Sequence, residues 1–421
     1  MDTPISPQSG PVRMLHFADL HIGTENYGAT DPQTGLSTRL RDFLRRMDEM
    51  IDDAREHDVD LVIFAGDAFK SRNPNATFQR EFAWRVRDLA DLAPTVLLVG
   101  NHDVPPNERK ASSIEIYATL AVPNVWVADE YDLQIQPTKR GPVAVAAAPY
   151  PIRSRILADQ RTTGQSIAET DRMVQRALMQ IIDDLAERAD AHAGPRVLTG
   201  HFTVSGAVYG SERGIMLGRD IQVLPSALMD NRWDYVALGH IHKHQNLSAK
   251  RPDAPPVVYS GSLERIDFGE EGDPKGYCWV ELARGATEWR FVRSQARPFV
   301  TLSADLRDVA EPTAAVIALI EAHDLSGAIT RLRLKLTQET EARLNEGLIR
   351  DALRQAGVAY IAAIAKDIEQ PARARLGGSP EELSDEELLD HYLKIKGMTP
   401  ERRELLMAAA AEIFEQARAA T

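Results

Sequence analysis

Five short motifs bring together aspartate, asparagine and histidine in a pattern that suits metal-dependent chemistry. Carboxylate, amide oxygen and imidazole, without thiolate, form a ligand set that suits manganese, iron or zinc better than calcium. Two ions about 3.5–4 Å apart, bridged by one carboxylate, are a recurrent device for cleaving phosphoesters. The motifs supply seven candidate ligands: Asp19, His21, Asp67, Asn101, His201, His240 and His242.

Each motif directly follows a short apolar run that is typical of a buried strand. The expected strands cover residues 12–18, 61–65, 95–99, 143–147, 197–199, 235–238 and 257–259. Residues i and i+2 of an extended chain point to the same side, so Asp19 can converge with His21, and His240 with His242. Apolar residues spaced three and four apart predict an amphipathic helix over 36–54. Strands and helices in alternation predict an α/β or layered α+β fold.

Composition narrows the class of protein. The chain has 421 residues, which suggests about three domains. Its 49 Lys and Arg against 62 Asp and Glu give a net charge of −13, which excludes a general polycation that coats nucleic acid. The single cysteine, Cys278, excludes an intrachain disulfide and a cysteine-rich zinc site. We expect a cytoplasmic protein without a membrane span, because the sequence shows neither a signal peptide nor an apolar run of roughly 18 residues.

The pattern divides the chain into four segments. Residues 12–277 carry all the motifs, and residues 297–370 are predicted to form a small β-α-β-α-β module without ligand spacing. A linker is expected over 371–380, followed by a hairpin of two amphipathic helices over 381–421. A hairpin of about 40 residues rarely holds a sufficient core by itself. It must therefore pack back on its own chain or dock a partner.

The motifs carry a resemblance to a known family. Asp-x-His, Gly-Asp, Gly-Asn-His-Asp, Gly-His and Gly-His-x-His, in this order, resemble the signature of the calcineurin-like metallophosphoesterases. Within that superfamily, the segment from Gly261 to Glu270 is similar to the one that follows the last metal motif of SbcD-type DNA repair nucleases. The resemblance covers residues 12–275 and implies a two-sheet core flanked by helices. The capping domain and helical hairpin of that family match the later segments in order and size.

The resemblance implies a role for each residue. The family binds its two ions through two ligand sets that share the bridging aspartate: Asp19, His21, Asp67 and His242, and Asp67, Asn101, His201 and His240. His102 matches a histidine that contacts the scissile phosphate and protonates the leaving oxygen, and Asp103 is expected to orient its imidazole. Relatives often carry histidine three residues after the bridging aspartate, where this chain has Lys70. The role of that position stays open.

The resemblance also implies a reaction and partners. We expect a two-metal, manganese-dependent DNA nuclease, with 3′–5′ exonuclease activity on double-stranded ends and endonuclease activity on single strands. It would act as a homodimer in DNA repair, recombination and replication, and its hairpin would bind an SbcC-type ATPase that gates access with ATP. Two alternatives stay open: a phosphodiesterase for small molecules such as cyclic nucleotides, and a DNA-end tether with a vestigial metal site.

Other basic residues and histidines have plainer interpretations. His16 lies inside an apolar run and is expected to be a core histidine. A solvated helix face is expected for Arg39, Arg41, Arg45 and Arg46. Contact with a phosphodiester backbone is an open possibility for four residues in loops near the motifs: Arg72, Arg109, Lys110 and Arg265.

Overall fold

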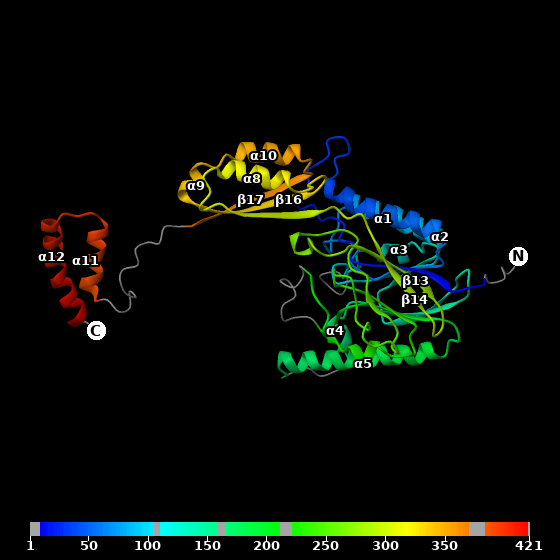
Figure 1. The fold of residues 1–421 in the computed structure, drawn as a ribbon. Helices are drawn as coiled ribbons and strands as arrows, with labels where there is room; N and C mark the ends of the chain where they lie inside the picture. Colours follow the sequence, from blue (N-terminus) through cyan, green and yellow to red (C-terminus); the bar gives the residue numbers. More distant parts are fainter. Residues whose placement is uncertain (1–8, 105–109, 159–164, 211–220, 370–383, 420–421) are drawn as a thin grey trace. The chain divides into compact units, whose positions relative to one another are not determined.

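The computed structural model describes residues 9–104, 110–158, 165–210, 221–369 and 384–419. The described strands form two six-stranded sheets, one three-stranded sheet and one two-stranded pair (Figure 1). No helix within these ranges is both long and apolar enough to cross a membrane. The two large sheets carry the strands that the sequence motifs follow.

The first large sheet has the strand order β14-β13-β1-β2-β3-β4. Its strands are β1 (Val12–Phe17), β2 (Leu61–Phe64), β3 (Thr95–Leu98), β4 (Val125–Ala128), β13 (Gly276–Leu282) and β14 (Glu288–Arg293). Strands β1 to β4 are parallel, β13 pairs with β1 in the antiparallel sense, and β14 pairs antiparallel with β13 at the edge of the sheet. Three helices belong to this half: α1 (Thr38–Glu56), α2 (Ala76–Leu92) and α3 (Ile116–Thr119).

The second large sheet has the order β11-β12-β10-β7-β6-β5. Its strands are β5 (Asp132–Gln136), β6 (Val143–Ala148), β7 (Arg196–His201), β10 (Tyr235–Gly239), β11 (Gln245–Asn246) and β12 (Val257–Tyr259). The inner four strands are parallel, and β5 and β11 close the edges in the antiparallel sense. Its helices include α4 (Arg153–Ile156), α5 (Ile167–Asp190) and α7 (Pro225–Leu228).

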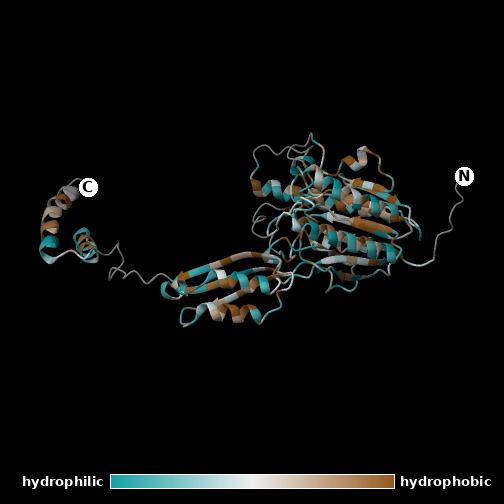
Figure 2. Cartoon of the chain, turned by 90° about the horizontal axis from the view of Figure 1, so that it is seen from above, coloured by the Kyte–Doolittle hydropathy of each residue, from teal (hydrophilic) through white to brown (hydrophobic). Residues whose placement is uncertain are grey.

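The cores lie between these elements in layers. Met14 of the first sheet shares a buried cluster with Val145 and Val197 of the second, so the two sheets pack face to face. Phe17 points to the opposite side of β1 and packs with α1 and α2, whereas Ile182 of α5 packs on the second sheet. Figure 2 shows the resulting alternation of brown and teal along the helices. The layers confirm the predicted α/β architecture of two sheets flanked by helices.

Two interpretations of single residues have opposite outcomes. His16 is fully buried and its Nδ1 lies 3.1 Å from Tyr235 Oη, which confirms a core histidine. The solvated face on α1 is wrong for Arg39 and Arg46, which are only 1% and 7% exposed. Arg39 Nη1 donates to Asp42 Oδ2 at 2.8 Å, so an ion pair compensates its burial.

The small module contains β15 (Phe299–Asp305), α8 (Pro312–Glu321), β16 (Ile329–Thr337), α9 (Gln338–Ala342), α10 (Glu346–Gln355) and β17 (Tyr360–Glu369). Its strands form a sheet in the order β15-β16-β17 (Figure 1). The chain divides into two compact units, residues 1–303, 316–333 and 346–365, and residues 304–315, 334–345 and 366–421. Their boundary runs through this module, and the predicted domain limits stay predictions.

The hairpin consists of α11 (Asp385–Ile395) and α12 (Pro400–Ala419), which contact each other. Ser384 begins it with a capping box: its hydroxyl accepts from Glu387 N, and Glu387 Oε2 accepts from Ser384 N at 2.8 Å. Leu405 is 73% exposed and Ile413 66% exposed, so apolar surface remains uncovered. The expected linker over 371–380 lies outside the described residues.

Candidate metal centre

The seven expected ligands meet where the parallel strands of both sheets end. Asp19 and His21 follow β1, Asp67 follows β2 and Asn101 follows β3, while the second sheet contributes the ends of β7 and β10. Ligand atoms of three residues, Asp19, His21 and His242, all lie within 4.8 Å of one another. The same holds for Asp19, Asp67 and His201. The sheets therefore bring together residues that are more than 200 positions apart in the sequence.

Asp67 lies between two groups of side chains. Its Oδ2 is 3.6 Å from His21 Nε2 and 3.4 Å from His201 Nε2. On the far side, Asn101 Oδ1 lies 3.0 Å from His201 Nε2 and 2.8 Å from His240 Nδ1. Asp67 is only 2% exposed, so its carboxylate is held away from water. A carboxylate that bridges two ions needs this central position.

The donor set itself calls for a cation. His201 Nδ1 lies 2.7 Å from the carbonyl oxygen of Ala65, which can only accept, so Nδ1 carries the proton. In the neutral imidazole, His201 Nε2 directs its lone pair toward two further acceptors, Asn101 Oδ1 and Asp67 Oδ2. Burial disfavours the imidazolium, yet the Asp67 carboxylate raises the pKa of His201 to about 9, so without a cation a second proton on Nε2 would balance this charge. The cluster thus demands a positive charge where these lone pairs converge, and a divalent cation supplies it.

The backbone is strained at four of the seven positions. Asp19, His21, Asp67 and His240 have φ values of 55°, 46°, 64° and 95°. Such left-handed conformations cost of the order of 1–3 kcal/mol each and persist where the surrounding structure enforces them. Backbone hydrogen bonds such as Asp19 N to Gly66 O, at 3.0 Å, hold the turns in place. The left-handed conformation turns the chain out of the strand, so that the ligand atoms face the other ligands.

Asp103 and His102 use partners other than the expected ones. The Asp103 carboxylate accepts from Asp67 N at 2.9 Å and from Gly100 N at 3.0 Å, so it holds the bridging residue in place. Burial, with the nearby Asp67 charge, raises the pKa of Asp103 to about 6. His102 Nδ1 instead lies 2.7 Å from the carbonyl oxygen of Lys70. The backbone of Lys70, rather than the Asp103 side chain, therefore orients the His102 imidazole.

Glu270 contacts an expected ligand, and the sequence reasoning missed this contact. It is fully buried, and its Oε1 accepts from His242 Nδ1 at 2.8 Å. Its Oε2 lies 2.8 Å from Nζ of Lys275, which is itself 2% exposed. Although burial favours the neutral acid, the Lys275 ammonium holds the pKa of Glu270 well below its usual range. The carboxylate fixes the Nδ1–H tautomer of His242 and leaves its Nε2 available as a ligand.

The loop cations have different fates. Arg265 donates to carbonyl oxygens of four residues and so supports the loop that carries Glu270 rather than a ligand: Glu270, Asp273, Ala296 and Arg297. Arg109 lies outside the described residues. Arg72 is exposed, and Lys110 lines a cavity that is described below.

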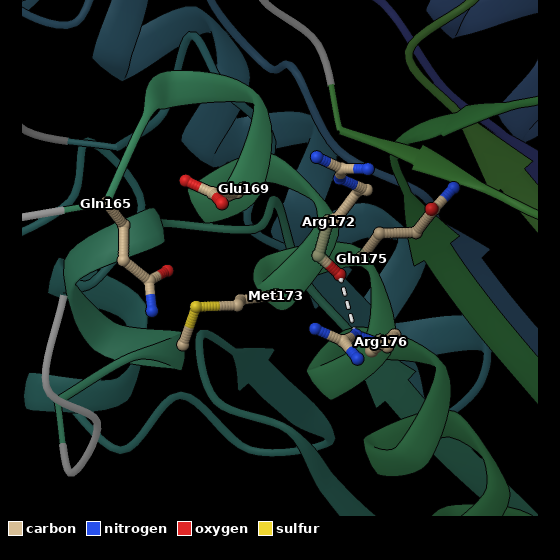
Figure 3. Close-up of a pocket in the computed structure, with 6 residues that line it drawn as sticks. All are labelled: Gln165, Glu169, Arg172, Met173, Gln175 and Arg176. Carbon is tan, nitrogen blue, oxygen red and sulfur yellow. Dashed lines mark hydrogen bonds between the residues drawn. The ribbon is translucent and has the colours of Figure 1, made fainter.

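A hollow outside the candidate metal centre lies along the helix α5. It has a volume of about 570 Å³, and Figure 3 shows the six residues that line it: Gln165, Glu169, Arg172, Met173, Gln175 and Arg176. None of them belongs to the seven expected ligands or to the groups that hold those ligands. This hollow is therefore separate from the expected ligands and from the groups that hold them.

Comparisons with known proteins identify the family of this chain. The model of the calcineurin-like phosphoesterase family matches residues 12–244. Three curated relatives each bear the name of the SbcD component of the nuclease SbcCD. The one from Bacillus subtilis is 28% identical over 70% of this chain and 72% of its own length. The one from Rhodobacter capsulatus is 27% identical over 88% and 90%, and the one from Escherichia coli K12 is 26% identical over 66% of both chains.

The predicted resemblance is confirmed at the level of the family. The matched region contains every expected ligand, from the end of β1 to the residues after β10. Together with the cluster around Asp67, this match shows that the chain belongs to the calcineurin-like phosphoesterase family and is a metal-dependent phosphodiesterase.

Proposed function

We propose that this chain is a manganese-dependent DNA nuclease, the nuclease subunit of an SbcCD-like repair complex in the cytoplasm. The observation that carries the proposal is the convergence of acceptor atoms around Asp67. The names of three relatives, which align with most of the chain, supply the substrate class. By the same resemblance it would act as a 3′–5′ exonuclease on duplex ends and as an endonuclease on single strands.

Each expected ligand has a place in this proposal. Two sets would hold two divalent ions, with Asp67 common to both: Asp19, His21, Asp67 and His242, and Asp67, Asn101, His201 and His240. When bound, the ions neutralise the phosphate oxygens and lower the pKa of water toward neutrality. A ligand set of nitrogen and oxygen atoms without thiolate suits manganese.

His102 would move the proton to the leaving oxygen. Because its Nδ1 donates to Lys70 O, its Nε2 is the nitrogen that takes up and releases a proton. His102 N also donates to Asp67 Oδ1 at 2.8 Å, which ties the position of the imidazole to that of the bridging carboxylate. General acid catalysis of this kind contributes about 10²–10⁴-fold to a rate.

The test is degradation of linear duplex DNA by the full chain with manganese. Asp67→Asn should abolish both cleavage and manganese binding, whereas His102→Asn should lose cleavage and keep the metal. A surface histidine, His323, supplies the matched control, and His323→Asn should behave like the original chain. Undiminished cleavage by both site variants would refute the proposal. Rapid turnover of cyclic nucleotides beside slow turnover of DNA would favour the small-molecule phosphodiesterase instead.

The module over 297–370 is proposed to cap the site and help select DNA. On β16, three cations at every second position share one face of the strand: Arg331, Arg333 and Lys335. The alternating leucines of the same strand are buried on the other face. Cations in a row suit a phosphodiester backbone, so Arg333→Gln with Lys335→Gln should weaken DNA binding and flatten its dependence on salt. The metal affinity of this double variant should be unchanged.

The hairpin is proposed to bind the coiled coil of an SbcC-type ATPase, which would gate access to the site with ATP. Tyr392, Leu405 and Ile413 are more than half exposed. The segment after Pro380 carries ten Asp or Glu against five Lys or Arg, which suits a protein partner better than DNA. Co-purification with the ATPase of the same organism should be lost on truncation after Gly378, and also with Leu405→Asp. Retention of the ATPase by both forms would contradict this role.

A homodimer is proposed through exposed apolar residues of α2 and α3 and through Leu120, which directly follows α3. Trp84 is 49% exposed, Ile116 50% and Leu120 68%. The two helices are neighbours, since the rings of Phe82 and Tyr117 lie 6.0 Å apart. Leu120→Glu should therefore convert a dimer into a monomer in light scattering. A monomer already in the unchanged chain would contradict the proposal.

A further inference from the structure

A cavity of about 630 Å³ lies beside the metal centre, and we call it the side pocket. Tyr150 lines it, and the ring of this tyrosine lies 5.9 Å from that of His240 and 6.4 Å from that of His201. Val99, which also lines it, is two residues before Asn101 and accepts from Tyr150 N at 3.0 Å. The side pocket therefore lies directly beside the ligands of the expected second ion, through Tyr150 and Val99.

The walls of the side pocket combine apolar and polar surface. Apolar side chains form much of its lining: Val99, Val104, Pro149, Ile152, Ile156 and Ile181. Ser112 and Tyr131 also line it, and the hydroxyl oxygens of both are buried without a hydrogen-bond partner among the described residues. A buried hydroxyl without a partner is costly, so a ligand toward which these side chains turn to form hydrogen bonds would relieve that cost. Burial raises the pKa of Tyr131, so its hydroxyl keeps the proton that it can donate.

The charges that line the side pocket disfavour a second phosphate site. Lys110 and Arg155 line it together with three carboxylates, those of Glu115, Asp129 and Glu130. An excess of negative charge repels a phosphate, whereas a neutral ligand with both donors and acceptors can use both signs. A flat heteroaromatic ring fits these walls, because it stacks on tyrosine and offers hydrogen bonds along its edge.

We propose that the side pocket receives one unpaired nucleobase of the DNA strand whose phosphate lies at the metal centre. The inference rests on the proposed nuclease function and names the part of the substrate that this chain recognises. The base must be unpaired, because its hydrogen-bonding edge faces Ser112 and Tyr131 instead of a partner base. Cleavage therefore requires that the strand end be opened next to the scissile bond. Every base can stack in the side pocket, and the hydrogen bonds of its edge set the relative rates for the four bases.

The test compares kcat/KM for a normal nucleotide and for an abasic nucleotide on either side of the scissile phosphate. Ala158 is exposed at the rim of the side pocket, so Ala158→Trp fills it with little risk to the fold. Ala168→Trp, on the exposed face of α5 and outside the lining, is the matched control. Loss of the base should reduce kcat/KM by about 5- to 100-fold in the original chain and in the control. In Ala158→Trp the normal substrate should be slow, and loss of the base should cost nothing more.

Tyr131→Phe gives a second readout, because it removes only the unpartnered hydroxyl. A merely structural tyrosine would lose stability, whereas here the unfolding temperature should stay the same or rise while the relative rates for the four bases change. Equal rates on normal and abasic substrates in the original chain, with manganese bound, would overturn the inference and leave the nuclease function standing. The absence of any DNA cleavage would overturn both.

Discussion

Replacing Glu270 by glutamine tests how the second layer of the site controls metal binding. The change keeps the size of the side chain and removes the negative charge that His242 Nδ1 and Lys275 Nζ both contact at 2.8 Å. A hydrogen bond to a charged group contributes about 1.5–3 kcal/mol. Since about 1.4 kcal/mol corresponds to a factor of ten in affinity, Glu270→Gln should weaken manganese binding by about 10- to 100-fold.

A second effect must be separated from the first. Glu270→Gln leaves the buried Lys275 ammonium without its counter-charge, and breaking a buried pair costs about 3–5 kcal/mol of folding free energy. The double variant Glu270→Gln with Lys275→Met removes that unpaired charge and should recover much of the lost stability. It should not recover the metal affinity, because His242 still lacks its carboxylate.

Calorimetric titration of manganese into chelator-treated protein measures the affinity, and thermal unfolding of the same samples measures stability. Glu271→Gln is the matched control, because the neighbouring Glu271 accepts from Thr301 and contacts no expected ligand. Unchanged affinity in Glu270→Gln would refute the positioning role. Full recovery of affinity in the double variant would show that the loss came from misfolding alone.

Three further predictions concern the core. Burial lowers the pKa of His16 to about 3, so between that pH and 6.5 the unfolded chain binds a proton that the folded chain does not. The free energy of unfolding should therefore fall, by up to about 1.4 kcal/mol per pH unit, as the pH drops below 6.5. Urea denaturation from about pH 7.5 to 5 should show a shallower slope for His16→Gln. Cys278 is fully buried with a pKa raised by burial to about 12, so Ellman's reagent at about pH 8 should label it only after denaturation. Prompt labelling of the folded chain would contradict its burial. A Cβ at Gly239 would lie 2.1 Å from Ala65 O, so Gly239→Ala should lower the unfolding temperature and the manganese affinity together, whereas Gly272→Ala, where a Cβ meets nothing within 4 Å, should change neither.

Much of the site was predictable from the sequence because buried strands end at recognisable polar motifs. The apolar runs before Asp19 and Asp67 end abruptly at a polar motif, and parallel strands place such ends at one edge. The seven residues could be gathered in this way without knowledge of any distance. Strand β14 escaped prediction, because it is only half-buried and lacks an uninterrupted apolar run.

The residues that support the ligands were harder to find. Glu270 lies 28 positions beyond His242, and its link to that histidine arises only when the loop folds back. The expected pairing of His102 with its neighbour Asp103 failed for a similar reason. Backbone amides at the ends of two different strands claim the Asp103 carboxylate, and a sequence does not display free backbone donors. The charge of Arg39 suggested solvent, but its ion-pair partners and the ring of Phe299 came from folding.

The left-handed backbone at Asp19, His21, Asp67 and His240 predicts which substitutions follow when a related chain loses metal binding. A lineage released from the need to hold metal gains stability when glycine or asparagine replaces these residues, because both adopt positive φ at lower cost. Selection for stability should then favour such replacements at all four positions. If these replacements occur together in a relative that keeps both sheets, that relative has lost its enzymatic activity and keeps a structural role.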